Sequence, residues 1–278
     1  MTATRLSTIR VEKPWGRKQL WPGFEDASGG PVGEIWFDAP AETHPELLVK
    51  YLFTSERLSI QVHPDDATAR ASGYPNGKDE AWVVLAAEPD STIALGMKHP
   101  VTREELRAAA LDGSIEALVD WRPVKAGDVI YSPAGTIHAI GAGLTIIEVQ
   151  QNLDLTYRLY DYGRPRELHL DAGVAVSAPV PFTHETQPIE HSEGRKILCA
   201  GGKFVLERWT WEGTRIVNLP AEANGWLIAV AGDGALNAAA LTAGDCWLLE
   251  GITRLTLNAG AEVLFAYPQT NPLPDIFG

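Results

Sequence analysis

Four side chains in three short motifs are suited to binding one divalent metal ion. The motifs read LSIQVHPDD, GKDEAW and SPAGTIHAIGAG, in that order along the chain. The four residues are Gln61, His63, Glu80 and His138. Imidazole and carboxylate groups are common ligands of divalent metals, and an amide oxygen can complete such a set. We therefore predict a metal site where the three motifs meet.

The first two of these residues lie on one short strand. Polar and apolar side chains alternate from Ser59 to His63, and in a strand such alternation points Gln61 and His63 to the same face. Pro64 follows and ends the strand, so the pair is expected near a rim. A single histidine is usually an ordinary core or surface residue, but this pairing with two further ligand types favours a metal site.

Composition narrows the class of protein. The 278 residues could form one large all-β domain or two ordinary domains, and 45% hydrophobic residues supply a substantial core. A net charge of −13 argues against broad binding to nucleic acid or to anionic membranes. An anionic substrate would therefore need basic residues gathered locally at its site.

The N-terminus and the cysteine content predict a cytoplasmic protein. The first residues lack the apolar core of a signal peptide, and no run approaches the roughly 18 apolar residues of a membrane helix. Cys199 and Cys246 are too few for a disulfide scaffold and lack zinc-finger spacing. We expect buried thiols, with a single disulfide as the alternative.

Short β-rich runs bounded by Gly, Pro and Asp predict a mainly β chain. These runs are 46–54, 58–63, 81–86, 91–96, 128–133, 144–150, 203–211, 225–230, 245–250 and 262–267. One helical insert, near 102–119, interrupts them. Thr102 and Glu105 form a capping box, Gly113 ends that helix, and Ser114 is expected to cap a second short one.

A short internal sequence similarity suggests that the chain has two related halves. AGDVIYS in the first half and AGDCWLL in the second each introduce a strand after a turn, although two unrelated turns could look as similar. In an ungapped overlay Leu255 takes the place of His138, so the second half is expected to lack the metal. We predict a metal-binding domain at 1–164, an irregular connection at 165–194 and a metal-free barrel at 195–278.

The motifs together resemble a known family. GDVIYSPAGTIHAIGAG resembles the second motif of a cupin. With QVHPDD, GKDEAW, EVQQNLDLTYRLYDYGR and the N-terminal EKPWGR, the chain resembles the class I mannose-6-phosphate isomerases, in the short bacterial form without a large helical domain. The resemblance runs from Val11 to about Gly163 and continues loosely beyond. It departs at Leu153, where the family often has serine, and we interpret this as the loss of one polar contact.

This resemblance implies both a fold and an activity. The implied fold is all-β, with two cupin-type jelly-roll (double-stranded β-helix) barrels and the helical insert in the first. The implied activity is interconversion of mannose 6-phosphate and fructose 6-phosphate, with one zinc ion per chain as cofactor. The implied zinc ligands are Gln61, His63, Glu80 and His138, and the implied active-site residues are Lys78, Glu148 and Arg158.

The implied reaction takes a proton from C2 and returns it to C1 through an enediol. It needs a general base, a group that stabilises the enediolate and an anchor for phosphate. Arg158 offers two donors in fixed geometry for an anion, although a salt bridge to Asp154 or Asp161 is the alternative.

Lys78 and Glu148 each have a competing interpretation. Lys78 lies two positions before Glu80 and on an extended segment would share its face, unless it is a solvated turn residue. Glu148 stands among β-branched residues and must face water or a polar cavity; burial would raise its pKa. The general base stays open between Glu148, Lys78 and water at the metal.

Two other functions stay open. One is a different metal cupin enzyme, either an iron oxygenase or an isomerase of another sugar phosphate, although a glutamine ligand is unusual for oxygen chemistry. The other is a non-catalytic sugar-phosphate sensor, which would not need Lys78, Glu148 and Arg158 together. We expect a small-molecule sugar phosphate as ligand, no nucleic-acid or membrane partner, and a monomer or homodimer.

Overall fold

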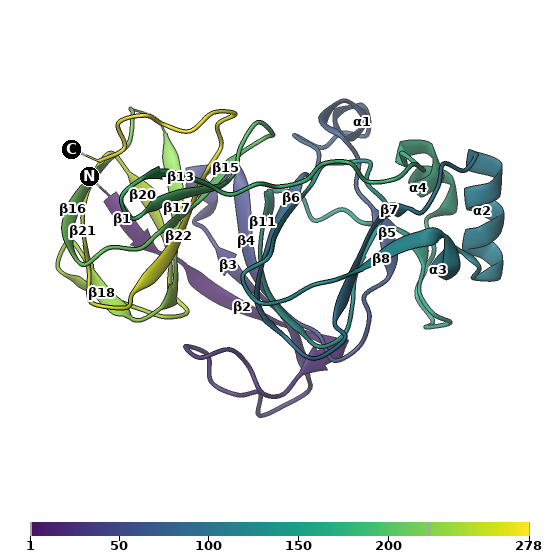
Figure 1. The fold of residues 1–278 in the computed structure, drawn as a ribbon, viewed down its shortest axis with the longest axis horizontal. Coiled ribbons are helices and arrows are strands. Elements are labelled where there is room, and N and C mark those ends of the chain that lie inside the picture. Colours follow the sequence, from purple (N-terminus) through teal and green to yellow (C-terminus); the bar gives the residue numbers. More distant parts are fainter. Residues whose placement is uncertain (1, 222, 278) are drawn as a thin grey trace.

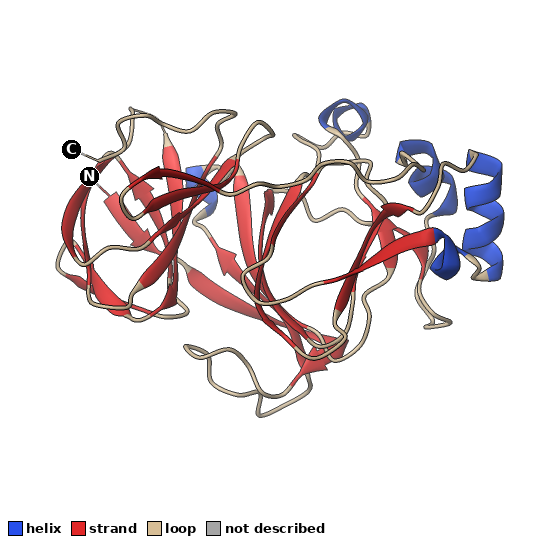
Figure 2. Ribbon diagram, in the orientation of Figure 1, coloured by secondary structure: helices blue, strands red, loops and turns tan. Residues whose placement is uncertain are grey.

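The computed structural model describes residues 2–221 and 223–277 and shows two β barrels side by side (Figures 1 and 2). We call them the first barrel and the second barrel. Each is built from two sheets, and most of the helices lie on the side of the first barrel that faces away from the second (Figures 1 and 2). The prediction of an all-β chain with a small helical insert in its first half is confirmed.

The first barrel pairs a central sheet with an outer sheet. The central sheet has the strand order β2-β3-β4-β11-β6-β9, and the outer sheet β12-β5-β10-β7-β8. The strands are β2 (Ser7–Arg17), β3 (Val32–Asp38), β4 (Leu47–Phe53), β5 (Ile60–Val62), β6 (Glu80–Ala87), β7 (Thr92–Met97), β8 (Val119–Pro123), β9 (Val129–Ser132), β10 (His138–Ile140), β11 (Leu144–Gln151) and β12 (Tyr157–Tyr160).

The second barrel pairs a large sheet, β1-β20-β17-β22-β15-β14-β13, with a small sheet, β16-β21-β18-β19. Its strands are β1 (Thr2–Arg5), β13 (Ile189–Ser192), β14 (Arg195–Cys199), β15 (Val205–Trp209), β16 (Gly213–Asn218), β17 (Asn224–Ala231), β18 (Asp233–Leu236), β19 (Ala239–Thr242), β20 (Cys246–Glu250), β21 (Ile252–Leu257) and β22 (Glu262–Tyr267). The first strand of the chain thus lies in the second barrel. The predicted division at 164 and 195 stays a prediction.

Hydrophobic cores lie on both faces of the central sheet. Val49, Tyr51 and Phe53 of β4 pack against the large sheet of the second barrel. Leu52, between two of them in sequence, points into the first barrel instead and packs with Trp82. Because side chains alternate along a strand, every second residue of the central sheet lines the inside of the first barrel.

Three helices cover the outer sheet: α2 (Arg103–Asp112), α3 (Ile115–Leu118) and α4 (Leu170–Val176). The other helices are α1 (Asp66–Ala71) and a short 3-10 helix at Ala41–Thr43. The predicted capping box is confirmed: Thr102 accepts from the amide of Glu105, and Glu105 accepts from the amide of Thr102. Leu106 of α2 packs with Ile60 and Val62 of the outer sheet.

Two local predictions were wrong. Ser114 precedes α3, but its side chain makes no capping hydrogen bond; its amide donates to Asp112 instead. The stretch 165–194, predicted to be irregular, contains α4 and β13. Helix α4 forms because the apolar sequence LDAGVAV packs on the outer sheet, with Gly173 close to Leu159.

Two further predictions concern membrane segments and the two cysteines. Among the residues described, no helix combines the length and the apolar character needed to cross a membrane. Cys199 and Cys246 are both free and buried, as expected.

A buried ion pair links the second barrel to the C-terminal segment. Glu207 accepts from Arg195 at 2.7 and 2.6 Å, and also from Trp209 and Tyr267. Arg195 also donates to the carbonyl of Leu273 at 2.7 Å. Both charged side chains are almost fully buried.

Replacing Arg195 with Met should lower the free energy of unfolding by about 3–5 kcal/mol, because it leaves the buried Glu207 carboxylate without its counter-charge. Urea denaturation measures this loss. Arg107→Met is the control, since Arg107 pairs with Asp171 at the surface and should contribute less than about 1 kcal/mol. Equal losses of the free energy of unfolding in the two variants would contradict this prediction, because burial of the pair would then have no effect of its own.

Candidate active site

Three of the four predicted metal ligands form a compact buried cluster. Glu80 Oε1 lies 3.3 Å from His63 Nε2, and Glu80 Oε2 lies 3.5 Å from His138 Nε2. One ligand atom from each residue falls within 4.8 Å of the other two. His63 directly follows β5, Glu80 begins β6 and His138 begins β10. The cluster therefore joins the outer sheet to the central sheet.

Both histidines are held in the form that binds metals. His63 Nδ1 lies 2.9 Å from the carbonyl of Leu155, and His138 Nδ1 lies 3.0 Å from that of Thr136. Each Nδ1 therefore carries the proton, and each Nε2 presents a lone pair to the cluster. Burial lowers the pKa of His63, with a further contribution from Lys78, and it lowers the pKa of His138 to about 4.

Gln61, the fourth predicted ligand, lies beside this cluster. It pairs with His138 across β5 and β10, and its Nε2 is 3.3 Å from His138 Nε2. Its Oε1 accepts from Ser59 at 3.0 Å. The two oxygens of Glu80 are buried, and the groups that the structure places next to them are Lys78 and the two histidines. The donor set fits a divalent metal, and the role of these residues as its ligands stays a prediction.

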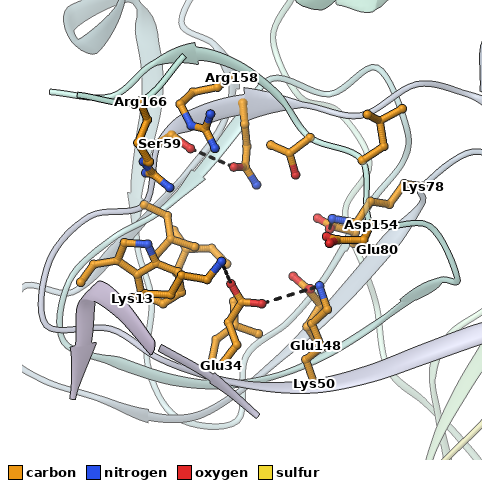
Figure 3. A pocket seen from close by; sticks show the side chains of 17 residues that line it. Lys13, Glu34, Lys50, Ser59, Lys78, Glu80, Glu148, Asp154, Arg158 and Arg166 are labelled. Atoms are coloured by element: carbon orange, nitrogen blue, oxygen red, sulfur yellow. Dashed lines mark hydrogen bonds and ion pairs between the residues drawn. The ribbon is translucent and has the colours of Figure 1, made fainter. Parts of the chain in front are cut away.

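A cavity of about 340 Å³ opens beside the cluster. Figure 3 shows charged side chains on its opposite sides. Arg158 and Arg166 lie on one side, Glu34, Lys50 and Glu148 face them across the cavity, and Lys78 and Glu80 occupy a third side (Figure 3). The local gathering of basic residues predicted for an anionic ligand is therefore present, despite the acidity of the whole chain.

Lys78 is buried in this site, so the alternative of a solvated turn lysine is wrong. Its Nζ lies 2.8 Å from Glu80 Oε1 and 3.4 Å from His63 Nε2. Although burial opposes it, the negative charges of Glu80 and Glu148 raise the pKa of Lys78. The charged ammonium form of Lys78 is therefore favoured.

Glu148 points into the cavity, so the alternative of an outward-facing residue is wrong. Its Oε2 accepts from Trp82 Nε1 at 3.0 Å, and its Oε1 lies 3.6 Å from Lys50 Nζ. Burial and the nearby carboxylate of Glu80 raise the pKa of Glu148 to about 7. A carboxyl group with such a pKa can both take up and release a proton near neutral pH.

Arg158 does not form the salt bridge considered as its alternative. Asp161 pairs with Arg166 at 2.5 Å and with Arg164 at 2.9 Å instead. Among residues 2–221 and 223–277, no carboxylate lies within ion-pair distance of Arg158; its guanidinium donates to the carbonyl of Glu167. Because Arg158 lies in β12 and not in a helix, Asp154, four positions before it, is not brought into pairing distance.

Sequence reasoning missed several residues of the cavity. Lys50 and Glu34 come from β4 and β3, and each is a charged residue with apolar neighbours in its strand. Lys50 Nζ lies 3.8 Å from Glu34 Oε2, and Lys13 Nζ lies 3.3 Å from Glu34 Oε1. The signal that identified Glu148, a charge amid strand residues, would also have identified these two. Arg166 lies in a loop and gave no such signal.

Known proteins share both sequence and fold with this chain. A mannose-6-phosphate isomerase of Streptococcus mutans is 35% identical over 190 residues, which are 65% of this chain and 59% of that protein. The mannose-6-phosphate isomerase ManA of Bacillus subtilis is 37% identical over 181 residues, 60% of this chain and 56% of that protein. The aligned part of the chain thus spans less than two thirds of either relative. No family model matches the chain.

Solved structures extend the similarity to almost the whole chain. A crystal structure of a mannose 6-phosphate isomerase from Bacillus subtilis has a TM-score of 0.84 at 25% identity, covering 96% of this chain and 99% of that one. A mutant phosphomannose isomerase from Salmonella typhimurium has a TM-score of 0.74 at 15% identity, covering 97% and 100%. The second similarity concerns the fold alone. Together they confirm the predicted cupin fold.

Replacing His138 with Ala should weaken zinc binding at least about 100-fold, because changes to the residues behind a metal ligand already weaken it about 10–100-fold. Competition with a chromophoric chelator, starting from metal-free protein, measures the affinity. His99→Ala is the matched control, because His99 is exposed and lies outside the cluster. Zinc binding of equal strength in the two variants would contradict the predicted site.

Proposed function

Since this chain is a homologue of the mannose-6-phosphate isomerases in sequence and in fold, we propose that it is a zinc-dependent isomerase. It interconverts mannose 6-phosphate and fructose 6-phosphate. One observation carries this proposal: beside the buried cluster of two histidines and Glu80, one cavity is lined by Glu80 itself, by Glu148, whose pKa is raised to about 7, and by two arginines.

Different residues of the cavity have different roles in the reaction. Glu148 is the general base that takes the proton from C2 and returns it to C1, because its pKa lies near neutral pH. Lys78, held in its charged form beside Glu80, stabilises the negative charge of the enediolate. This assignment removes Lys78 from the candidates for the base.

The phosphate is held at the opposite side of the cavity. Arg158 and Arg166 lie together there (Figure 3), and Arg158 Nε has no hydrogen-bond partner among the described residues. A guanidinium group can bind phosphate through paired hydrogen bonds. The Nε and Nη2 of Arg166 already donate to Asp161, so Arg166 contributes its remaining donors and its positive charge. The separation of the two sides leaves the sugar carbons between the arginines and the carboxylates.

The proposed cofactor is one zinc ion per chain, held by His63, Glu80, His138 and Gln61. Bound there, zinc would polarise a sugar oxygen as a Lewis acid. The donor set fits a divalent metal, and zinc is our choice among such metals because nitrogen and carboxylate ligands suit it. A cytoplasmic location and a monomeric or homodimeric state stay predictions of the sequence.

Purified protein should isomerise mannose 6-phosphate, lose this activity on treatment with a chelator and regain it with added zinc. A coupled assay of fructose 6-phosphate measures the turnover. Restoration by zinc but not by magnesium would identify the class of metal. No turnover in a zinc-loaded sample would contradict the proposal and favour an isomerase of another sugar phosphate or a sensor.

Glu148→Gln should lower kcat by about 10²–10⁴-fold while zinc stays bound, because the amide cannot take up a proton. The change is nearly isosteric, and the glutamine oxygen can still accept from Trp82 Nε1. Steady-state kinetics and metal analysis of the same sample give both quantities. Activity within a few fold of the unsubstituted protein would exclude Glu148 as the base.

A further inference from the structure

A loop of the second barrel contacts the first barrel at Asp66 and Tyr131. This loop, residues 200–204, connects β14 to β15. Lys203 Nζ donates to Asp66 Oδ2 at 2.8 Å, so it bridges from the second barrel to the start of α1. The two residues are 137 positions apart in sequence. The contact is therefore a tertiary link between the two barrels and not a local pairing.

Asp66 also accepts hydrogen bonds that hold the segment leading into Glu80. Its other oxygen, Oδ1, accepts from the amide of Gly77 at 2.8 Å and from Gln151 Nε2 at 3.1 Å. Gln151 Oε1 in turn accepts from the amide of Asp79 at 3.0 Å. Gly77 and Asp79 flank Lys78 directly, so the backbone on both sides of this lysine is held by the group that Lys203 contacts.

A second chain of hydrogen bonds runs from the same loop to the same segment. The amide of Lys203 donates to the hydroxyl of Tyr131 at 2.9 Å, and this hydroxyl donates to Asp79 Oδ2 at 2.6 Å. Asp79 Oδ1 accepts from the amide of Ala134 at 3.0 Å. Asp79 is thereby fixed from two sides, immediately before Glu80.

The loop approaches Tyr131 too closely for any side chain at Gly202. A Cβ placed on Gly202 would lie 2.0 Å from the hydroxyl oxygen of Tyr131. The ring of Tyr131 also packs against Phe204, with ring centroids 5.4 Å apart. The contact between the loop and the first barrel is therefore close-packed as well as hydrogen-bonded.

We propose that Lys203 is a positioning residue for the active site: through Asp66 and Tyr131 it fixes the backbone that presents Lys78 and Glu80. The second barrel thus contributes to the site although none of its described residues lines the cavity. This inference rests on the proposed metal site. It implies that the second barrel helps to hold the side chains of that site in position.

The geometry favours positioning over stability as the role of this link. Lys203 is 44% exposed and Asp66 21% exposed, and ion pairs at such positions add little to the free energy of unfolding. Functional groups, by contrast, must be held within about 0.5 Å of their working positions by the residues behind them. A contact of small energetic weight can therefore have a large effect on metal affinity and rate.

Lys203→Met tests the proposal against two control variants. We expect it to weaken zinc binding about 10-fold, as changes behind metal ligands do, and to lower kcat with little change in KM. Lys203→Arg keeps the charge and should restore most of both quantities. Lys196→Met is the matched control, since Lys196 is 39% exposed, pairs with Glu190 and lies in the same barrel; it should change neither quantity.

A structural measurement keeps the test independent of activity. Hydrogen exchange of the Gly77 amide, which donates to Asp66, should quicken about 3-fold in metal-free Lys203→Met, within what an exposed ion pair contributes, and stay unchanged in Lys196→Met. Tyr131→Phe, which keeps the ring packing, should quicken exchange at Ala134, whose acceptor Asp79 is then less well held.

These readouts separate failure of this inference from failure of the proposed function. If the chain does not isomerise mannose 6-phosphate, zinc affinity and amide exchange still report on positioning. If Lys203→Met matches Lys196→Met in both zinc affinity and Gly77 exchange, the inference is overturned. A lower melting temperature alone, with both readouts unchanged, would also overturn it, because the link would then be merely structural.

Discussion

The central sheet is buried on both faces, and this constraint determines where the charged residues of the molecule lie. One face packs against the large sheet of the second barrel, and its residues are apolar. The alternating positions point into the first barrel, so polar residues in these strands must be buried there together. Lys50, Glu148 and Glu80 all lie on this inner face, paired with one another or with the nearby histidines.

The pKa of each buried carboxyl group in the site depends on the charged side chains next to it. Although burial opposes it, Lys50 and Lys13 hold the pKa of Glu34 below its usual range. Glu148, by contrast, has the carboxylate of Glu80 nearby, and its pKa rises. Two carboxyl groups in one cavity thus take opposite protonation behaviour from their neighbours alone. Burial in the cavity disfavours the charged form of each carboxyl group. Because their charged neighbours differ, the two groups have different chemical roles.

The sequence predicted the parts of the site that depend on local patterns. Alternation around Gln61 and the spacing of Lys78 and Glu80 follow from strand geometry, and the structure brings these residues together. Residues that meet only through strand pairing were missed, because register is not local: Lys50 faces Glu148 across β4 and β11. For the same reason no local pattern indicated that β1 joins the second barrel.

The position of β1 also bears on how the protein forms during synthesis. Arg5 pairs with Trp247, and its side chain contacts Asp245, 240 positions later. Pairings this distant slow folding, because a long stretch of chain must be ordered to close them. Until β20 has left the ribosome, β1 lacks its neighbour and the apolar face of the central sheet is incompletely covered. The nascent chain therefore passes through a stage in which exposed apolar surface makes it prone to aggregation, the situation in which chaperones act.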